Sequence, residues 1–245
     1  MLAQRSTLLA LFLSAATILG ATGCGGGSSE SVPTANIGGE NTSTPANDPQ
    51  RVERPVVLTS QESQSPAASV KSPAELKPRV VLKTTLGNIT IELDSEKAPV
   101  TVDNFLAGYV DRDFYTGTIF HHVDPTSLVA AGGFTEDLTA KPVRAHIRCE
   151  ADNGLSNVRG TVTMAREPSY PDSATSQFMI NMADNTYLDH QNDDDPEAFG
   201  YCVFGRVVEG MDVVDQIAAT PAEANGDFPA LPKTPVVIQS IERVQ

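Results

Sequence analysis

The sequence predicts one mainly-β domain, a small β-barrel with helical caps, in residues 77–245. Three observations favour this fold class: several short segments rich in β-branched residues, only two short stretches with helical periodicity, and a length of about 170 residues for this part of the chain. The full chain of 245 residues is 40% apolar but only 6% aromatic. That composition suits a modest core with polar chain attached to it.

The domain begins with a predicted β-hairpin. Residues 79–86 are rich in Val, Leu and Thr, and Ile89 to Leu93 alternates with a period of two. Gly87-Asn88 lies between the two runs and is a two-residue turn signal. We therefore expect two antiparallel strands joined at Gly87-Asn88.

Pro99 opens the first predicted helix, because a proline at the first helical position loses no intrahelical hydrogen bond. Val102, Phe105, Leu106 and Tyr109 follow at the spacing of one helical face. These four side chains are expected to face the core.

Later segments complete the pattern of short strands. Strands are predicted at 160–165, 178–181, 201–208 and 235–242. A second short helix is predicted at 211–219, with Val214 and Ile217 facing inward.

The N-terminal 23 residues are typical of a secretory signal peptide. Arg5 precedes an apolar core that ends near Leu19, which is too short for a comfortable membrane span. Small residues then lead to Cys24, a pattern that resembles the bacterial lipoprotein signal. This resemblance predicts lipidation at Cys24; an ordinary secretory signal with an incidental cysteine is the alternative. Gly25, after the cysteine, favours the outer membrane facing the periplasm if the source is Gram-negative.

Residues 24–76 are predicted to be a disordered tether that carries the lipidated Cys24. They are rich in Gly, Ser, Pro, Thr and Asn, and cannot bury enough apolar surface to offset their ordering entropy. The net charge of −14 is uneven, because residues 1–76 carry −2 and residues 77–245 carry −12. This acidity excludes a nucleic-acid binder, which needs a basic face.

Five strings in the domain resemble those of the cyclophilins in order and spacing: 114–123, 132–135, 176–180, 188–189 and 203–214. Two more strings, 150–155 and 183–185, are most similar to the periplasmic bacterial branch of that family. The resemblance covers about residues 78–245.

The resemblance implies an eight-stranded antiparallel closed barrel capped by two α-helices, with peptidyl-prolyl cis–trans isomerase activity. We predict no cofactor and no metal. The predicted partners are proline-containing polypeptides of the cell envelope, bound by a monomer that the lipoprotein signal anchors to the membrane.

The resemblance also assigns the site residues. His122 stands at the position of the catalytic Arg of the family. The substrate-binding positions are Phe120, His121, Ser127, Leu128, Ala130, Ala165, Gln177, Met179, Leu188 and Tyr201.

Several of these positions depart from the family pattern. Ser127 and Met179 replace phenylalanines, and Ala130 replaces a glutamine that grips the substrate backbone. His122 is shorter than Arg and, with a reference pKa near 6.5, carries little charge at neutral pH. We therefore expect a weakened isomerase; a non-catalytic peptide-binding or chaperone module on the same barrel is the alternative.

Three other features have simpler interpretations. Cys149 and Cys202 are predicted to be separate buried thiols, with a disulfide as the alternative. His121 and His122, as neighbours on a strand, point to opposite faces and poorly share one metal ion. The acidic run 192–197 is predicted to be a solvated loop at the rim of the site that disfavours acidic substrates.

Overall fold

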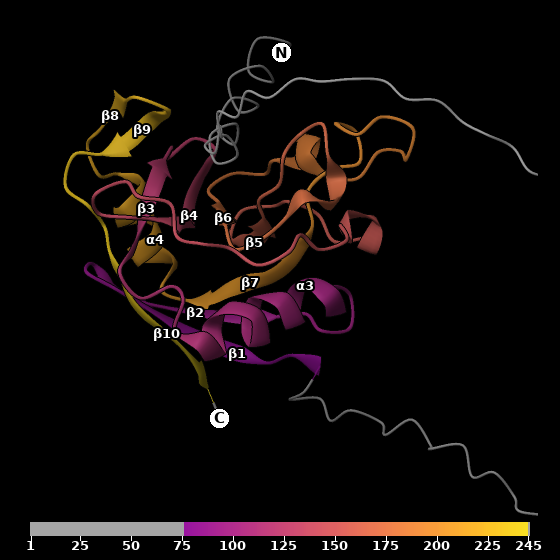
Figure 1. The fold of residues 1–245 in the computed structure, drawn as a ribbon, viewed down its shortest axis with the longest axis horizontal. Helices are drawn as coiled ribbons and strands as arrows, with labels where there is room; N and C mark the ends of the chain where they lie inside the picture. Colours follow the sequence, from indigo (N-terminus) through magenta and orange to yellow (C-terminus); the bar gives the residue numbers. More distant parts are fainter. Residues whose placement is uncertain (1–75, 245) are drawn as a thin grey trace, which may run out of the picture. The chain divides into compact units, whose positions relative to one another are not determined.

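The computed structural model describes residues 76–244, so the predicted signal peptide, Cys24 and nearly all of the predicted tether lie outside the described residues. Eight strands form one antiparallel sheet in the order β10-β1-β2-β7-β5-β6-β4-β3 (Figure 1). The strands of this sheet are β1 (Arg79–Thr84), β2 (Gly87–Leu93), β3 (Thr118–Val123), β4 (Leu128–Thr135), β5 (Thr161–Met164), β6 (Phe178–Asn181), β7 (Val203–Glu209) and β10 (Ile238–Val244).

The sheet curls into a nearly closed barrel, because its two outermost strands, β3 and β10, approach each other. Ile119 forms an isolated antiparallel bridge with Val237. The backbone nitrogen of Phe120 donates to the carbonyl of Val236 at 3.0 Å, and that of Gly117 donates to the carbonyl of Ile238 at 2.9 Å. The predicted mainly-β barrel with two helices is confirmed. Among the described residues, no helix is long and apolar enough to cross a membrane.

The first hairpin forms where it was predicted, but its turn is two residues earlier. Thr84 pairs with Gly87, so Thr85 and Leu86 make the turn. The Thr84 hydroxyl accepts hydrogen bonds from the backbone nitrogens of Leu86 and Gly87, both at 3.1 Å. Gly87 starts β2 with φ of +144°, and a Cβ there would lie 2.8 Å from Val213. The glycine is therefore needed for close packing and not as a turn residue.

The first helix is continuous but changes its winding. It begins as α3 (Pro99–Asp103), continues as a π-helical stretch (Asn104–Tyr109) and ends as a 3-10 turn (Val110–Arg112). The predicted inward face is confirmed, because Val102, Phe105, Leu106 and Tyr109 are all buried.

The second helix, α4 (Met211–Ala218), buries Val214 and Ile217 as predicted. The sequence pattern missed β4, whose run of two alanines and two glycines has no strand signature. It also missed a separate hairpin of β8 (Ala222–Asn225) and β9 (Phe228–Pro232). Short 3-10 turns lie at Ala151–Asn153, Pro171–Ser173 and Thr186–Leu188.

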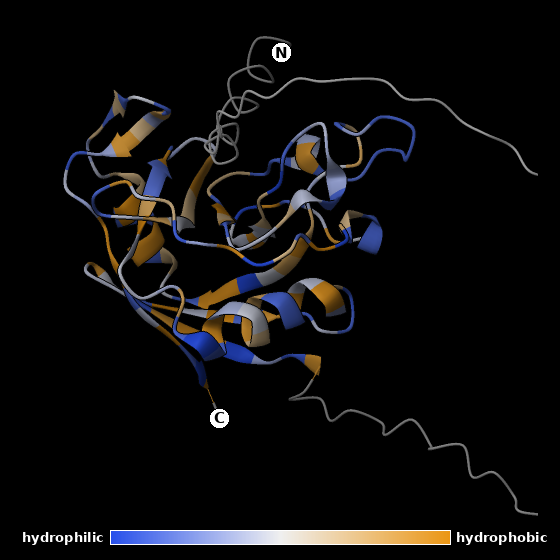
Figure 2. Ribbon diagram, viewed as in Figure 1, coloured by the Kyte–Doolittle hydropathy of each residue, from blue (hydrophilic) through white to orange (hydrophobic). Residues whose placement is uncertain are grey.

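Apolar residues concentrate in the strands and on the inner sides of both helices, while the long connections are hydrophilic (Figure 2). The main core lies inside the barrel and includes Leu82, Ile91, Phe105, Phe178 and Phe204, all fully buried. At an estimated 1.5–3 kcal/mol for each large buried apolar side chain, this cluster is the main source of stability.

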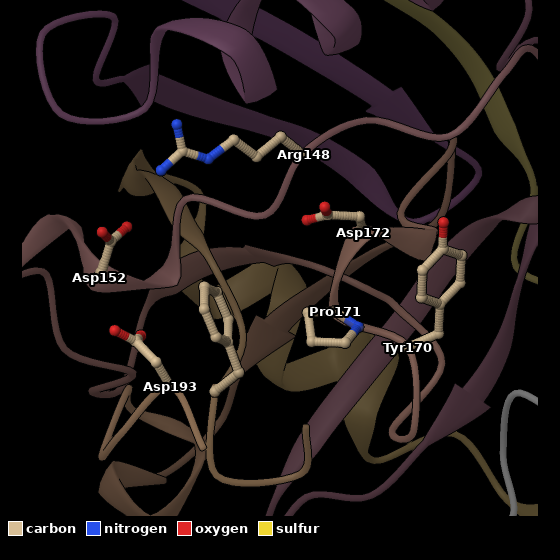
Figure 3. Close-up of a pocket in the computed structure, with 7 residues that line it drawn as sticks. Arg148, Asp152, Tyr170, Pro171, Asp172 and Asp193 are labelled. Carbon is tan, nitrogen blue, oxygen red and sulfur yellow. The ribbon is translucent and has the colours of Figure 1, made fainter. Parts of the chain in front are cut away.

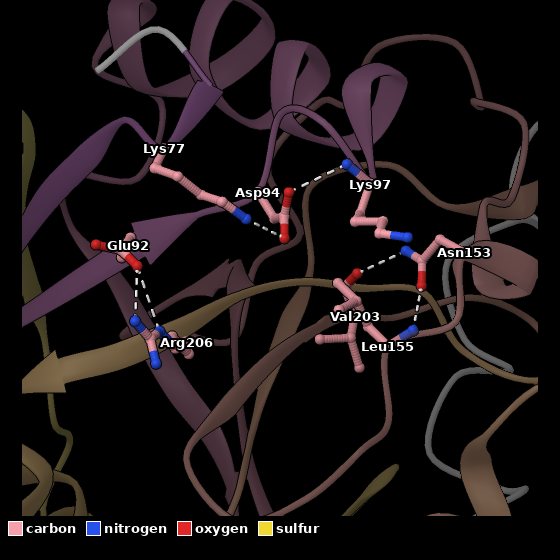
Figure 4. A network of polar contacts seen from close by, with 8 residues as sticks. All are labelled: Lys77, Glu92, Asp94, Lys97, Asn153, Leu155, Val203 and Arg206. Carbon is pink, nitrogen blue, oxygen red and sulfur yellow. Dashed lines mark hydrogen bonds and ion pairs between the residues drawn. The ribbon is translucent and has the colours of Figure 1, made fainter. Parts of the chain in front are cut away.

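Polar contacts join β2 and β7 on the outside of the barrel (Figure 4). Glu92 on β2 accepts from Arg206 on β7 at 2.9 Å and from Arg79 on β1 at 2.6 Å. Nearby, the Asn153 side chain donates to the carbonyl of Val203 at 2.9 Å and accepts from the nitrogen of Leu155 at 2.9 Å. The bond from Asn153 to Val203 holds the loop before β5 against the start of β7.

Candidate functional site

Three of the predicted site residues lie in one cross-strand row. His122 on β3 pairs with Ala130 on β4, and Ala130 pairs with Met179 on β6. The register of β3 against β4 shifts between Phe120 and His122, which marks a bulge at this point. The positions that hold Arg, Gln and Phe in the family are therefore adjacent on the neighbouring strands β3, β4 and β6.

A second apolar cluster lies on the opposite face of these strands from the main core. It contains six predicted site residues: Leu128, Ala130, Ala165, Met179, Leu188 and Tyr201. Their strand neighbours Val129 and Ile180 belong to the main core instead. Because side chains alternate between the faces of a strand, β4 and β6 contribute to both clusters at once. We call the six residues the outer cluster.

The electrostatics of His122 differ from those of an arginine. Burial lowers the pKa of His122, and the nearby Asp124 carboxylate only partly opposes this effect. The ring is therefore neutral at neutral pH. Its buried Nδ1 atom has no hydrogen-bond partner within residues 76–244.

The turn between β3 and β4 is held by its own side chains. The Asp124 carboxylate accepts from the backbone nitrogen of Thr126 at 2.8 Å and from its hydroxyl at 2.6 Å. Ser127 follows and is buried beside the outer cluster, where its carbonyl accepts from the Asn185 side chain at 2.9 Å. The turn therefore fixes the positions of Ser127 and Leu128 at the outer cluster.

Gln177 directly precedes β6, and its side chain faces Gly133 of β4. A Cβ at Gly133 would lie 2.8 Å from the Gln177 side chain, so a larger residue there would push this side chain aside. The carbonyl of Gln177 accepts from the nitrogen of Ala165 at 3.0 Å, which joins two predicted site positions through the backbone.

Phe120 and His121 lie apart from the outer cluster. Phe120 is fully buried in the main core. His121 packs edge-on against Phe134 and Phe228, with ring centroids 5.0 and 6.0 Å away. Burial lowers the pKa of His121 to about 3, so its ring is neutral. The β8–β9 hairpin therefore covers His121 through Phe228.

Sequence reasoning missed two buried polar residues beside the outer cluster. Asn157 is fully buried and contacts Asp189, Thr163 and the carbonyl of Tyr201. Arg166 is also buried, and its guanidinium carbon lies 4.7 Å from the centre of the Tyr201 ring. Arg166 lies outside the sequence motifs described above. It is buried because the segment after β5 and the loop before β7 come together around it in the folded protein. Thr163 and Asn181, polar residues inside apolar strands, were the available signal for the Asn157 network.

Cys149 and Cys202 are separate, buried free thiols, in agreement with the favoured prediction. Burial raises the pKa of Cys202 to about 12 and also raises the pKa of Cys149. Both sulfurs are therefore protonated at neutral pH and poorly reactive.

The acidic loop contributes one wall of a cavity of about 390 Å³ that contains none of the predicted site residues. Figure 3 shows Arg148, Asp152 and Asp193 on one side of this cavity and Tyr170 on the opposite side, with Asp172 and Pro171 between them. Asp172 also accepts from the backbone nitrogen of Cys149 at 2.8 Å. Asp193, Asp194 and Asp195 are exposed, as expected of a solvated loop.

The chain matches the family model "Cyclophilin type peptidyl-prolyl cis-trans isomerase/CLD" over residues 79–243. It is 50% identical to peptidyl-prolyl cis-trans isomerase A of Dickeya dadantii, over 68% of this chain and 84% of that protein. It is also 50% identical to a peptidyl-prolyl cis-trans isomerase of Acinetobacter baylyi, over 66% of this chain and 84% of that protein.

A solved structure carries the same fold at low sequence identity. The cyclophilin-type isomerase of Cryptosporidium parvum superposes with a TM-score of 0.59 at 22% identity, over 69% of this chain and 98% of that one. Together with the family match and the close bacterial relatives, the barrel and its two helices lead to one conclusion. The chain belongs to the cyclophilin-type peptidyl-prolyl cis–trans isomerases, enzymes that act on proline-containing polypeptides.

Proposed function

We propose that this domain isomerises X–Pro bonds at the outer cluster, with weakened catalysis, in proteins of the cell envelope. The observation that carries the proposal is the cross-strand row His122–Ala130–Met179 beside the outer cluster. This row has the arrangement expected of a catalytic residue next to a proline pocket.

The reaction needs no covalent chemistry. Rotation about an amide bond has a barrier of about 18–20 kcal/mol, and uncatalysed X–Pro isomerisation takes tens of seconds or more. A site lowers this barrier when it holds the proline ring in an apolar pocket and places a hydrogen-bond donor or a cation near the prolyl nitrogen of the twisted amide. In this chain the outer cluster supplies the apolar pocket, and His122 supplies the donor.

Three substitutions account for the weakened activity. A neutral His122 ring donates one N–H where the family Arg offers five donors and a permanent charge. Ala130 has no amide to hold the substrate backbone, and Met179 is a softer pocket wall than phenylalanine. If one charge-assisted hydrogen bond of roughly 1.5–3 kcal/mol is lost, the rate falls by about one to two decades.

The catalytic test is the isomerisation of a short Ala-Pro peptide by the protein at pH 6 and pH 8. We expect slow catalysis that drops in a His122→Ala variant and rises at least tenfold in a His122→Arg, Ala130→Gln double variant, about 1.4 kcal/mol. Activity no greater than that of His122→Ala at both pH values, with peptide binding retained, would instead favour a non-catalytic peptide-binding module.

The cellular role rests on the N-terminal sequence. A lipid at Cys24 would anchor a monomeric domain to the envelope membrane through residues 24–76, on the periplasmic side of the outer membrane in a Gram-negative cell. Its substrates are then proline-containing polypeptides that fold in that compartment.

Fractionation of cells that express the full chain tests this anchoring. The parent chain is expected in the membrane fraction and a Cys24→Ala variant outside it, while a Cys149→Ala control fractionates like the parent. A Cys24→Ala variant that stays in the membrane fraction would contradict lipid anchoring.

A further inference from the structure

Arg166 is a buried cation without a carboxylate partner among residues 76–244. Only 3% of its surface is exposed, and none of the ion pairs in this part of the chain includes it. Burying an unpaired charge is costly unless other groups replace its hydration. Its surroundings must therefore compensate the charge in another way.

Backbone carbonyls provide this compensation. The Nε atom of Arg166 donates to the carbonyl of Gly200 at 2.6 Å, and Nη2 donates to the carbonyl of Pro196 at 2.8 Å. The Nη1 atom donates to the carbonyls of Glu167 and Pro168, both at 2.8 Å. One planar guanidinium thus joins the chain after β5 to the acidic loop before β7.

The fifth contact of Arg166 is aromatic. Its guanidinium carbon lies 4.7 Å from the centre of the Tyr201 ring, the geometry of a cation–π interaction. Tyr201 belongs to the outer cluster, as does Ala165, the residue just before Arg166. The cation therefore adjoins a wall of the proposed proline pocket.

The acidic loop is closed at a neck that contains two residues of the outer cluster. The nitrogen of Tyr201 donates to the carbonyl of Leu188 at 2.8 Å. Gly200 has φ of +82°, and a Cβ there would lie 2.6 Å from the nitrogen of His190. The bond from Arg166 to Gly200 therefore holds the neck itself, and the bond to Pro196 holds the loop beyond it.

We infer that Arg166 is a positioning residue of this isomerase, which sets the pocket wall made by Leu188 and Tyr201 and fixes the acidic loop at its edge. The inference rests on the proposed placement of the proline site at the outer cluster. Arg166 does not contact the substrate in this role; it acts through the neck and the Tyr201 ring.

The test compares Arg166→Met with Arg166→Lys and with the control Arg206→Met in the full-length protein. Arg206 is an arginine on the outside of β7 whose partner is Glu92. Loss of the guanidinium loosens a wall that binds the proline ring in ground and transition states alike. We therefore expect KM for an Ala-Pro peptide to rise about tenfold in Arg166→Met, with kcat within twofold, as for the loss of a hydrogen bond to a charged group.

The other two variants sharpen the comparison. Arg166→Lys keeps the charge but not the planar fork, so its KM should lie between those of the parent and Arg166→Met. Arg206→Met should leave both constants unchanged. A fall in kcat at unchanged KM, in proportion to the folded fraction, would show a merely structural role and overturn the inference. Unchanged constants in folded Arg166→Met would also overturn it if limited digestion of the acidic loop is unchanged as well.

A second readout does not depend on catalysis or on where the peptide binds. Limited digestion with a protease that cuts after acidic residues should cleave residues 193–197 at least tenfold faster in Arg166→Lys than in the parent, while Arg206→Met is cut like the parent. Faster cleavage without a change in KM would place the proline site elsewhere and count against the proposed site. Unchanged cleavage in Arg166→Lys would overturn the positioning role even if Arg166→Met fails to fold.

Discussion

The side-chain nitrogen of Asn157 donates to the carboxylate of Asp189 at 2.8 Å, and the backbone nitrogen of Asn157 donates to the same oxygen at 2.7 Å. Asp189 directly follows Leu188 of the outer cluster. The other end of the Asn157 amide accepts from the Thr163 hydroxyl at 2.8 Å. The pair thus connects β5 to the loop that carries part of the proposed pocket.

Replacement of Asn157 tests this connection. Asn157→Ala should lower the free energy of unfolding by about 1–3 kcal/mol, because Asp189 and Thr163 lose a buried partner. Asn157→Asp should cost more, because it places a second carboxylate against Asp189. Urea unfolding at pH 7 measures both, and Asn88→Ala, at an exposed position on β2, should change stability by less than about 0.5 kcal/mol. An Asp variant as stable as the Ala variant would contradict this account.

The buried His121 predicts a specific pH dependence of stability. Burial lowers its pKa from 6.5 in the unfolded chain to about 3 in the folded protein. Between these values the unfolded state binds more protons, so stability is full above pH 6.5 and is lost as the pH falls towards 3. A His121→Phe variant should therefore lose less stability over this window than the parent, with the difference reaching a few kcal/mol.

Urea unfolding at pH 4 and pH 7 checks the His121 prediction. Other acidic groups titrate in the same range, so the difference between variant and parent is the relevant quantity. His146→Gln, at an exposed position, is the matched control and should keep the pH dependence of the parent. A His121→Phe protein with the parent's pH dependence would show that His121 does not contribute.

Glu150 caps the N-terminus of helix α3, whose own N-cap residue, Ala98, makes no side-chain capping hydrogen bond. Its carboxylate accepts from the backbone nitrogens of Val100 and Thr101 at 3.1 and 2.9 Å, and from the Thr101 hydroxyl at 2.8 Å. Glu150→Ala should destabilise the protein by about 1–2 kcal/mol, as for loss of an N-cap, and Glu150→Gln by less. Thermal unfolding measures the loss, with the exposed Glu96→Ala as control. Equal melting temperatures for Glu150→Ala and Glu96→Ala would rule out this capping role.

The acidic loop should affect substrate choice through its charge. Changing Asp193, Asp194 and Asp195 to Asn should raise kcat/KM for peptides with acidic residues beside proline, relative to peptides with basic residues. The effect should shrink at high salt, because exposed charges are screened. A control that changes Glu209 to Gln and Asp212 to Asn removes exposed charge from β7 and α4. An unchanged ratio of kcat/KM values at low salt would contradict the prediction.

The first hairpin and both helical faces could be predicted from local sequence. Alternation in 89–93 and the spacing of Val102, Phe105 and Tyr109 reflect which side chains must be buried, and burial depends on the period of the element itself. The turn at Thr85 and Leu86 could not be predicted in the same way. In the folded chain Gly87 pairs with Thr84 and lies against Val213 of α4, a contact from a distant part of the chain that local sequence does not indicate.

The same distinction between local sequence and distant contacts holds for the candidate site. Motif strings indicated the residues of the outer cluster and the replacements at His122 and Ala130, because those identities are local. The sequence alone therefore indicated a cyclophilin barrel with an altered catalytic position. Only the tertiary structure decided that Phe120 and His121 are buried away from the outer cluster, and that Arg166 and Asn157 support it. Partners such as Gly200 for Arg166 and Asp189 for Asn157 are brought together by long-range packing, which local periodicity does not encode.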